Sequence, residues 1–156
     1  MIYASDIAGR ALHGAWAAAS DSTSPNGLKL ATPDTGVANT SNALAAPADY
    51  VDVTFTADAG TPYTIWLRTQ ALANSKFNDS LWVQFSDAQA GGSPIYHGAY
   101  WLSQPATVTF TSSGTHTIRL QVREDGVQFD QMVLSPATYL NTPPGPATSD
   151  STIVPR

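Results

Sequence analysis

The residues from Thr115 to Leu134 constrain the fold of this chain most strongly. In residues 115–123, apolar and polar side chains alternate with a period of two, which is typical of a β-strand that buries one face and exposes the other. The expected buried face consists of His116, Ile118, Leu120 and Val122. After Glu124-Asp125-Gly126 the apolar segment Phe129–Leu134 follows, and Asp-Gly between two such runs is a strong hairpin signal. We therefore predict a two-stranded β-hairpin over these residues.

Several other segments also have the character of short strands. They are residues 28–32, 50–58, 63–70, 81–85 and 108–110. Short strands separated by turn-forming Gly, Pro, Asn and Asp residues are typical of an all-β sandwich. Residues 2–20 favour strand or loop over helix, because Gly9 and Gly14 interrupt the pattern before three helical turns accumulate. The sequence thus predicts an all-β fold, a β-sandwich or jelly-roll.

The chain is expected to form one domain over residues 1–140, followed by a linker over residues 141–156. A chain of 156 residues is long enough to bury a sizeable core. The C-terminal stretch is rich in Pro, Ser and Thr, a composition that favours an extended and semi-rigid chain. A linker in this place implies that another domain is attached beyond it.

Charge and cysteine content exclude several kinds of function. The formal net charge is −5, whereas nucleic acids and anionic membranes attract a basic surface. We therefore expect neither as a partner. The sequence contains no cysteine, which excludes disulfides, zinc–thiolate sites and cysteine nucleophiles together.

Four stretches of sequence resemble a known family. They are Asp49-Tyr-Val-Asp-Val-Thr-Phe, Ala59-Gly-Thr-Pro-Tyr-Thr-Ile-Trp-Leu-Arg, Gly114-Thr-His-Thr-Ile-Arg-Leu and Gly126-Val-Gln-Phe-Asp-Gln-Met-Val-Leu. The first pair resembles a β-hairpin, and the second pair the closing hairpin, of carbohydrate-binding modules of the family 6 and 35 type. The match covers Asp49–Ser135. The resemblance implies a galactose-binding-like β-jelly-roll that is secreted and attached to a glycan-degrading enzyme.

The resemblance also implies roles for single residues. Asp130 matches an aspartate that often binds a structural calcium in the family, and Asp6 is the acidic residue near the first strand. Calcium takes 6–8 oxygen ligands, so these two candidates give too few anionic oxygens and we expect no cofactor requirement. Gln128 stands where the family often has a sugar-binding asparagine. Trp101 matches the family's sugar-stacking aromatic.

The residues for catalysis are sparse. Glu124 is the single glutamate, and it lies beside Asp125 in the predicted turn, where both carboxylates are expected to be solvated. A glycosidase needs two carboxyl groups that face one another across a cleft. His116 falls on the predicted core face, and the histidines have no metal-ligand spacing. We expect that the chain is not an enzyme.

A first candidate sugar site is the aromatic loop that contains Tyr96, Tyr100 and Trp101. A flat aromatic side chain suits the apolar C–H face of a sugar ring, and nearby amides and carboxylates suit its hydroxyls. The loop with Asn78 and Asp79 is the candidate source of those polar groups. The alternative is that the aromatic side chains fill one end of the sandwich and that Asn78-Asp79 forms an ordinary turn.

A second candidate site is the outward face of one sheet. Alternation places Trp66 and Arg68 outward on one strand and Trp82 and Gln84 outward on another. Exposed tryptophans of this kind favour a ligand surface. The alternative is that a loop, such as residues 37–47, covers them. Arg119 and Gln121 are further members of the predicted face.

The function that these patterns favour is non-catalytic polysaccharide binding. Such a module holds an attached domain at its glycan by raising its effective concentration there. The alternative is a structural or adhesion domain that binds other protein domains and no sugar.

Overall fold

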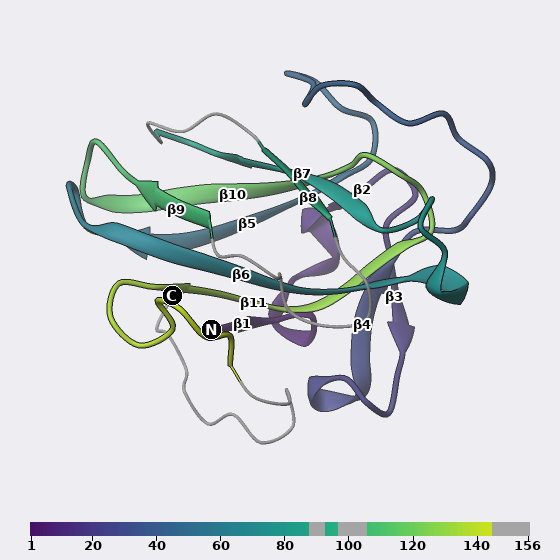
Figure 1. The fold of residues 1–156 in the computed structure, drawn as a ribbon, viewed down its shortest axis with the longest axis horizontal. Coiled ribbons are helices and arrows are strands. Elements are labelled where there is room, and N and C mark those ends of the chain that lie inside the picture. Colours follow the sequence, from purple (N-terminus) through teal and green to yellow (C-terminus); the bar gives the residue numbers. More distant parts are fainter. Residues whose placement is uncertain (88–92, 97–105, 145–156) are drawn as a thin grey trace.

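A computed structural model describes residues 1–87, 93–96 and 106–144, with the backbone alone for residues 93–96 and 106. Two antiparallel sheets pack face to face (Figure 1). Sheet A has the order β3-β4-β11-β6-β9, with β1 also paired to β11, and sheet B has the order β2-β5-β10-β7-β8. The predicted all-β sandwich is confirmed.

The bounds of the elements are as follows. Sheet A consists of β1 (Ile2–Tyr3), β3 (Ala17–Ser20), β4 (Leu28–Ala31), β6 (Pro62–Ala71), β9 (Ala106–Thr109) and β11 (Val127–Ser135). Sheet B consists of β2 (Leu12–His13), β5 (Tyr50–Ala57), β7 (Ser80–Phe85), β8 (Ser93–Tyr96) and β10 (Gly114–Val122). Short 3₁₀ turns occupy Ala4–Asp6, Gly9–Ala11, Pro25–Gly27 and Leu72–Asn74. Among the described residues, no helix is long and apolar enough to cross a membrane.

The core lies between the two sheets and follows the predicted alternation. Ile118 and Leu120 on β10 are completely buried, and Ile65 and Leu67 on β6 face them from sheet A. His116 is also buried, as predicted: its Nε2 lies 3.0 Å from the Ser112 carbonyl oxygen. Its ring packs 4.2 Å from that of Phe110, centroid to centroid. This histidine is a core residue whose ring has a hydrogen-bond partner.

The predicted hairpin over Thr115–Leu134 is wrong. β10 pairs with β5 and β7 in sheet B, whereas β11 pairs with β1, β4 and β6 in sheet A. The connection at residues 123–126 therefore crosses from one sheet to the other. The hairpin expected for β5 and β6 is a crossing of the same kind. Alternation and an Asp-Gly turn are compatible with both arrangements, because each strand buries one face either way.

The predicted turn carboxylates are buried, which corrects the expectation that they are solvated. Glu124 is 5% exposed and accepts hydrogen bonds from the Ser80 hydroxyl at 2.5 Å and from Arg123 Nη1 at 2.9 Å. Burial alone would raise the pKa of Asp125, but backbone N–H groups that include Val37 donate to it and lower the pKa overall. Both carboxylates tie loops together at one end of the sandwich.

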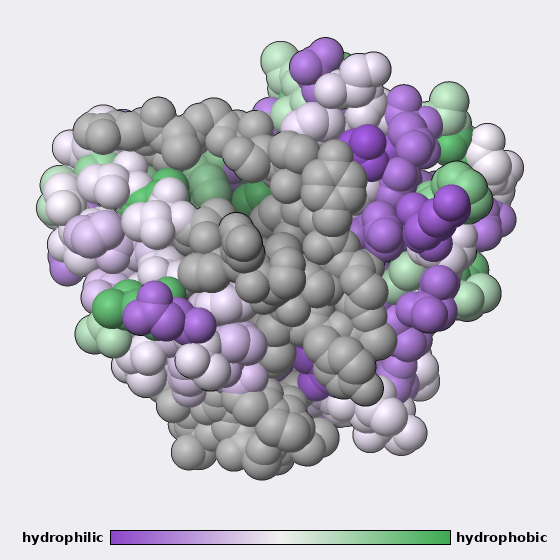
Figure 2. Space-filling model, in the orientation of Figure 1, coloured by the Kyte–Doolittle hydropathy of each residue, from purple (hydrophilic) through white to green (hydrophobic). Residues whose placement is uncertain are grey.

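Outside the core, apolar side chains are scattered. On the face shown in Figure 2, the green apolar residues lie singly or in small groups among white and purple ones. The large apolar side chains that the structure shows as exposed are Val37, Leu44, Leu72, Phe77 and Leu140. The described surface therefore offers a partner mainly hydroxyl, amide and charged groups.

Candidate functional site

The first predicted site lies largely beyond the described part of the chain. Tyr100 and Trp101 are outside the described residues, and Tyr96 ends β8 with only its backbone described. The polar partners expected beside them are visible. Asn78 is 3% exposed, and its Nδ2 donates to Asp34 Oδ2 at 2.9 Å. Its amide thus holds two loops together.

Asp79 is half-buried at the same end of the sandwich. Burial, together with the neighbouring carboxylate of Glu124, raises the pKa of Asp79. The Asp79 backbone N–H donates to Glu124 Oε2 at 3.2 Å. Gly126 packs directly against the Asn78 side chain: its φ is +73°, and an added Cβ would lie 2.4 Å from Asn78 Nδ2. Asn78 and Asp79 therefore belong to a packed polar cluster.

Phe77 is the aromatic at this end that sequence reasoning did not assign as a sugar-stacking residue. Its side chain is 66% exposed, and Lys76 Nζ lies 5.0 Å from the ring centroid. The Asn78 N–H donates to the Ser75 carbonyl at 3.1 Å, so the chain around it is held in place. Nothing in the local sequence pattern distinguishes an exposed loop phenylalanine from a buried one.

The second predicted site is separated by the fold. Trp66 lies on β6 in sheet A and Trp82 on β7 in sheet B, so the interpretation that they share one face is wrong. The chain crosses between the sheets after β6, which alternation within each strand does not reveal. Both tryptophans are buried. Trp66 Nε1 donates to the Tyr139 carbonyl and Trp82 Nε1 to Thr40 Oγ1, each at 2.7 Å.

Residues 37–47 cover part of sheet B, as the alternative expected. The Leu44 N–H donates to Gln121 Oε1 at 2.8 Å, and Gln84 Nε2 donates to the Leu44 carbonyl at 3.2 Å. In Figure 1 this blue loop between β4 and β5 extends well away from the two sheets before it returns. It hides Trp82 and Gln121 but leaves the neighbouring part of the face open.

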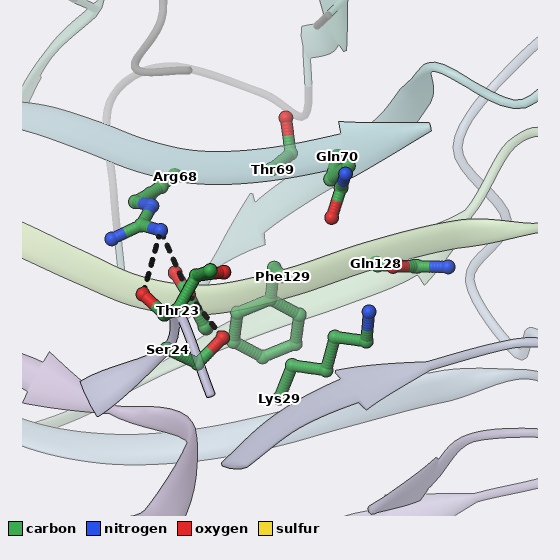
Figure 3. A pocket seen from close by; sticks show the side chains of 9 residues that line it. Thr23, Ser24, Lys29, Arg68, Thr69, Gln70, Gln128 and Phe129 are labelled. Carbon is green, nitrogen blue, oxygen red and sulfur yellow. Dashed lines mark hydrogen bonds and ion pairs between the residues drawn. The ribbon is translucent and has the colours of Figure 1, made fainter. Parts of the chain in front are cut away.

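The outer face of sheet A carries a small polar cavity (Figure 3). Its volume is about 20 Å³, and its lining includes Gln128, Arg68 and Asp130. A space of this size holds one water molecule, since a water needs about 10–15 Å³ by the same kind of measure. Gln128, which lines this small cavity, is 6% exposed.

The residues around Asp130 do not fit the calcium that the resemblance implies. Asp130 Oδ2 accepts from Ser24 Oγ at 2.6 Å and lies 3.5 Å from Arg68 Nη2. Asp6 Oδ2 accepts from the Tyr3 N–H at 3.1 Å. No group of three His, Cys, Asp or Glu side chains suited to a metal ion occurs among the described residues. Calcium needs several oxygen ligands, and here an arginine faces the principal carboxylate.

The outer face of sheet B carries an open groove of about 310 Å³. Its lining consists of Asp52, Gln84, Phe85, Ser86, Thr117 and Arg119. Arg119 stands opposite Asp52 on β5 and opposite Gln84 on β7, so the three side chains form one row across the sheet. This volume is at the lower end of ligand pockets, about 300–1,000 Å³.

The position of Arg119 in that row is fixed from two sides. Its Nε and Nη2 donate to the two oxygens of Asp52 at 2.7 and 2.8 Å, and these bonds raise the pKa of Arg119. Its guanidinium also lies 4.0 Å from the ring centroid of Tyr50, whose other neighbour is the stacked ring of His13. Gln84 Oε1 is a buried acceptor with no hydrogen-bond partner in the described part of the chain.

Comparison with known proteins identifies the architecture. No protein-family model and no curated protein matches the chain. Among solved structures, the GH26-CBM35 β-(1,4)-mannanase of Podospora anserina superposes with a TM-score of 0.60 at 16% identity, over 93% of this chain. The chain spans only 28% of that protein.

Two isolated modules match over nearly their whole length. The carbohydrate-binding module CBM6cm-2 from Cellvibrio mixtus lichenase 5A, solved with cellotriose, gives a TM-score of 0.56 at 12% identity and covers 86% of this chain and 94% of its own. The family 35 module from Clostridium thermocellum gives 0.52 at 15% identity, with coverage of 86% and 96%. The chain thus has the β-sandwich fold of family 6 and family 35 carbohydrate-binding modules.

Proposed function

We propose that this chain is a non-catalytic carbohydrate-binding module and that the groove on the outer face of sheet B binds the glycan. The observation that carries the proposal is the row Asp52–Arg119–Gln84 along an open groove of about 310 Å³. A sugar hydroxyl both donates and accepts hydrogen bonds. The row supplies acceptors on Asp52 and Gln84 and donors on Arg119, all held in place before a ligand arrives.

Gln84 lines the groove, and its buried Oε1 has no hydrogen-bond partner among the described residues. Buried polar atoms in native proteins nearly always have one, so this side chain can turn its amide oxygen toward a ligand donor in the groove without breaking a bond at that oxygen. Thr117 and Ser86 add hydroxyls to the same lining. The Thr117 N–H donates to Ser86 Oγ at 2.8 Å and the Ser86 N–H donates to the Thr117 carbonyl at 2.9 Å, which keeps the floor of the groove rigid.

The electrostatics of the groove favour a neutral glycan. The Arg119 charge is paired with Asp52 in a two-bond contact, and the chain carries a net charge of −5. Among the described residues that line the groove, no cation is left over for a carboxylate or sulfate of the ligand. Binding should therefore be weak and nearly independent of salt, because few counterions are released.

The module's role is to hold an attached domain at a polysaccharide outside the cell. The GH26-CBM35 β-(1,4)-mannanase, in which a comparable fold forms 28% of the chain, supports this role. The Pro-rich residues 141–156 are the proposed tether, and residues 145–156 lie outside the described part. The alternative is a structural or adhesion domain that binds protein partners.

The loop aromatics Tyr96, Tyr100 and Trp101 remain a second predicted sugar site. Phe77, exposed in the segment before β7, is a further aromatic on the described surface. The sheet B groove takes precedence because its lining and its orphan acceptor are both described.

The function is tested by affinity electrophoresis against soluble neutral and acidic polysaccharides at low and high salt. We expect retardation by at least one neutral glycan, with little change as salt is raised. Retardation by none of a broad set would favour the structural or adhesion domain. Retardation by acidic glycans alone, abolished by salt, would mean that the binding surface is charged and lies elsewhere.

Two matched glutamines test the site. Gln84→Ala removes the orphan acceptor on sheet B, and Gln70→Ala removes an exposed glutamine on sheet A. One hydrogen bond of about 1 kcal/mol corresponds to roughly fivefold in affinity, which we expect for Gln84→Ala only. Equal affinities for the two variants would contradict the proposed site while leaving the function open.

A further inference from the structure

We propose that the guanidinium of Arg68 is the resident cation of the Asp130 site and replaces the divalent ion that the resemblance implies. The consequence is that the loop between β3 and β4, which contains Thr23 and Ser24, is fixed to sheet A without any metal. This inference concerns stability and does not depend on the glycan site.

A β-bulge brings Asp130 to this position. β11 pairs with β6 through Phe129↔Thr69 and then Gln131↔Arg68, so Asp130 is the extra residue of the bulge. A bulge re-aims a side chain that regular alternation would point elsewhere. Here the Asp130 carboxylate meets Ser24, which precedes the 3₁₀ turn Pro25–Gly27, and Arg68 on β6.

Arg68 makes the same kind of link that a structural ion makes. Its Nη2 lies 3.5 Å from Asp130 Oδ2 on β11 and donates to the Thr23 carbonyl at 3.1 Å. Figure 3 shows the Arg68 guanidinium above Thr23 and Ser24, with dashed lines for its contacts with the Thr23 carbonyl and the Asp130 carboxylate and for the bond between Ser24 and Asp130. One positive group thus joins a carboxylate of the sheet to a backbone carbonyl of the loop, two ligand types that calcium also prefers.

A second cation pairs with Asp21, a neighbouring carboxylate whose charge acts on Asp130. Asp21 Oδ2 accepts from Lys29 Nζ at 2.8 Å, and Lys29 lines the same cavity as Arg68. Each carboxylate already has its own positive partner. A divalent ion placed there would be repelled by two fixed cations, in a region where burial weakens screening.

The space that remains suits one water. Asp130 Oδ1 and Thr69 Oγ1 are buried without a hydrogen-bond partner in the described part of the chain, and both residues line the cavity of about 20 Å³. A water needs two to four polar partners and a space of about this size. Arg68, Ser24 and one water therefore complete the surroundings of Asp130.

The first arm of the test uses the wild-type chain. Its melting temperature is measured with chelator and with millimolar calcium, and we expect the same value in both. A rise of several degrees with calcium, lost on chelation, would show that a divalent ion binds despite Arg68 and would overturn the proposal.

The second arm is a double-mutant cycle of Arg68→Met, Asp130→Asn and their combination. Arg68→Met removes the positive partner of the buried Asp130 carboxylate and should lower the melting temperature by about 10 °C, with the double variant losing clearly less than the sum. Arg68→Lys keeps the charge and serves where Arg68→Met does not fold; it should lose less. Additive losses would mean that Arg68 only fills space and would contradict its role as the cation.

Discussion

Each outer face of the sandwich carries an arginine–aspartate pair, and the two pairs differ in their surroundings. On sheet A, the side chains of Arg68 and Asp130 are 18% and 8% exposed, beside a cavity of about 20 Å³. On sheet B, those of Arg119 and Asp52 are 28% and 29% exposed, along a groove of about 310 Å³. The same chemical pair is enclosed on one face and accessible on the other.

The difference lies in what covers each sheet. Residues after β11 and Met1 cover sheet A, through Tyr139 over Trp66 and through the contact of Gln131 Nε2 with Met1 Sδ. The loop at residues 37–47 covers only part of sheet B. An enclosed ion pair stabilises the fold as a unit, because removing one partner leaves the other charge buried without water or a counter-charge. Partial exposure leaves the other pair free to meet a ligand.

The largest expected effect comes from Trp66→Ala on the covered face. Trp66 is 1% exposed, so its truncation should cost about 3–5 kcal/mol of unfolding free energy, measured by urea denaturation. Phe77→Ala is the control, since Phe77 is 66% exposed and should cost far less. A loss below about 1 kcal/mol for Trp66→Ala would mean that the outer face of sheet A is not sealed in solution.

The next largest effects are expected when each of the two arginines is replaced by methionine in turn. Arg119→Met should leave stability within about 1 kcal/mol, because partly exposed pairs contribute little, yet lower glycan affinity about tenfold or more. Arg68→Met should show the reverse pattern, with lower stability and unchanged affinity. Calorimetry and urea unfolding on both variants give the comparison. Matching losses of affinity would remove the functional distinction between the faces.

A smaller effect is expected at the loop end, the rival sugar site. The pKa of Asp79 is raised in the folded chain, so folding favours the protonated form of this carboxyl group. The stability that the protonated carboxyl contributes is fully present below the unfolded pKa and is lost as the pH rises through the folded pKa. Asp79→Asn mimics the protonated form and should slightly stabilise the chain at neutral pH, because solvent screens a partly exposed carboxylate. The gain should vanish near pH 4, about where the unfolded carboxyl titrates.

The control for this effect is Glu124→Gln. Glu124 accepts from Ser80 and Arg123, so its neutral form loses charge-assisted bonds and should destabilise the chain at neutral pH. Stabilisation by both substitutions would show that the two carboxylates repel each other more strongly than their donors compensate.

Periodicity predicted the longer strands and the core, but it did not predict which sheet each strand joins. Alternation in residues 115–123 correctly placed His116 and Ile118 inward. It could not tell a hairpin from a crossing between sheets, and so it joined Trp66 and Trp82 on one face. The position of Asp130 depends on a bulge, and a one-residue shift of this kind leaves no mark in a fully buried strand.

The sequence also gives little indication of which segments cover the outer faces of the two sheets. The segment that caps Trp66 includes Tyr139 and has no regular period, so its contact with sheet A could only come from the three-dimensional structure. Coverage of Trp82, by contrast, can be anticipated from the sequence, because a tryptophan on a solvent-exposed face is unusual. The alternative that residues 37–47 cover it is confirmed.

The central claim is that the outer face of sheet B binds glycan, and nuclear magnetic resonance titration tests it most directly. An oligosaccharide of the glycan found by electrophoresis is added to the labelled chain, and backbone amide shifts are followed. We expect shifts that concentrate at Asp52, Gln84, Thr117 and Arg119, with Arg68 and Gln70 unmoved. Shifts confined to Phe77, Asn78 and the loop around Trp101 would contradict it.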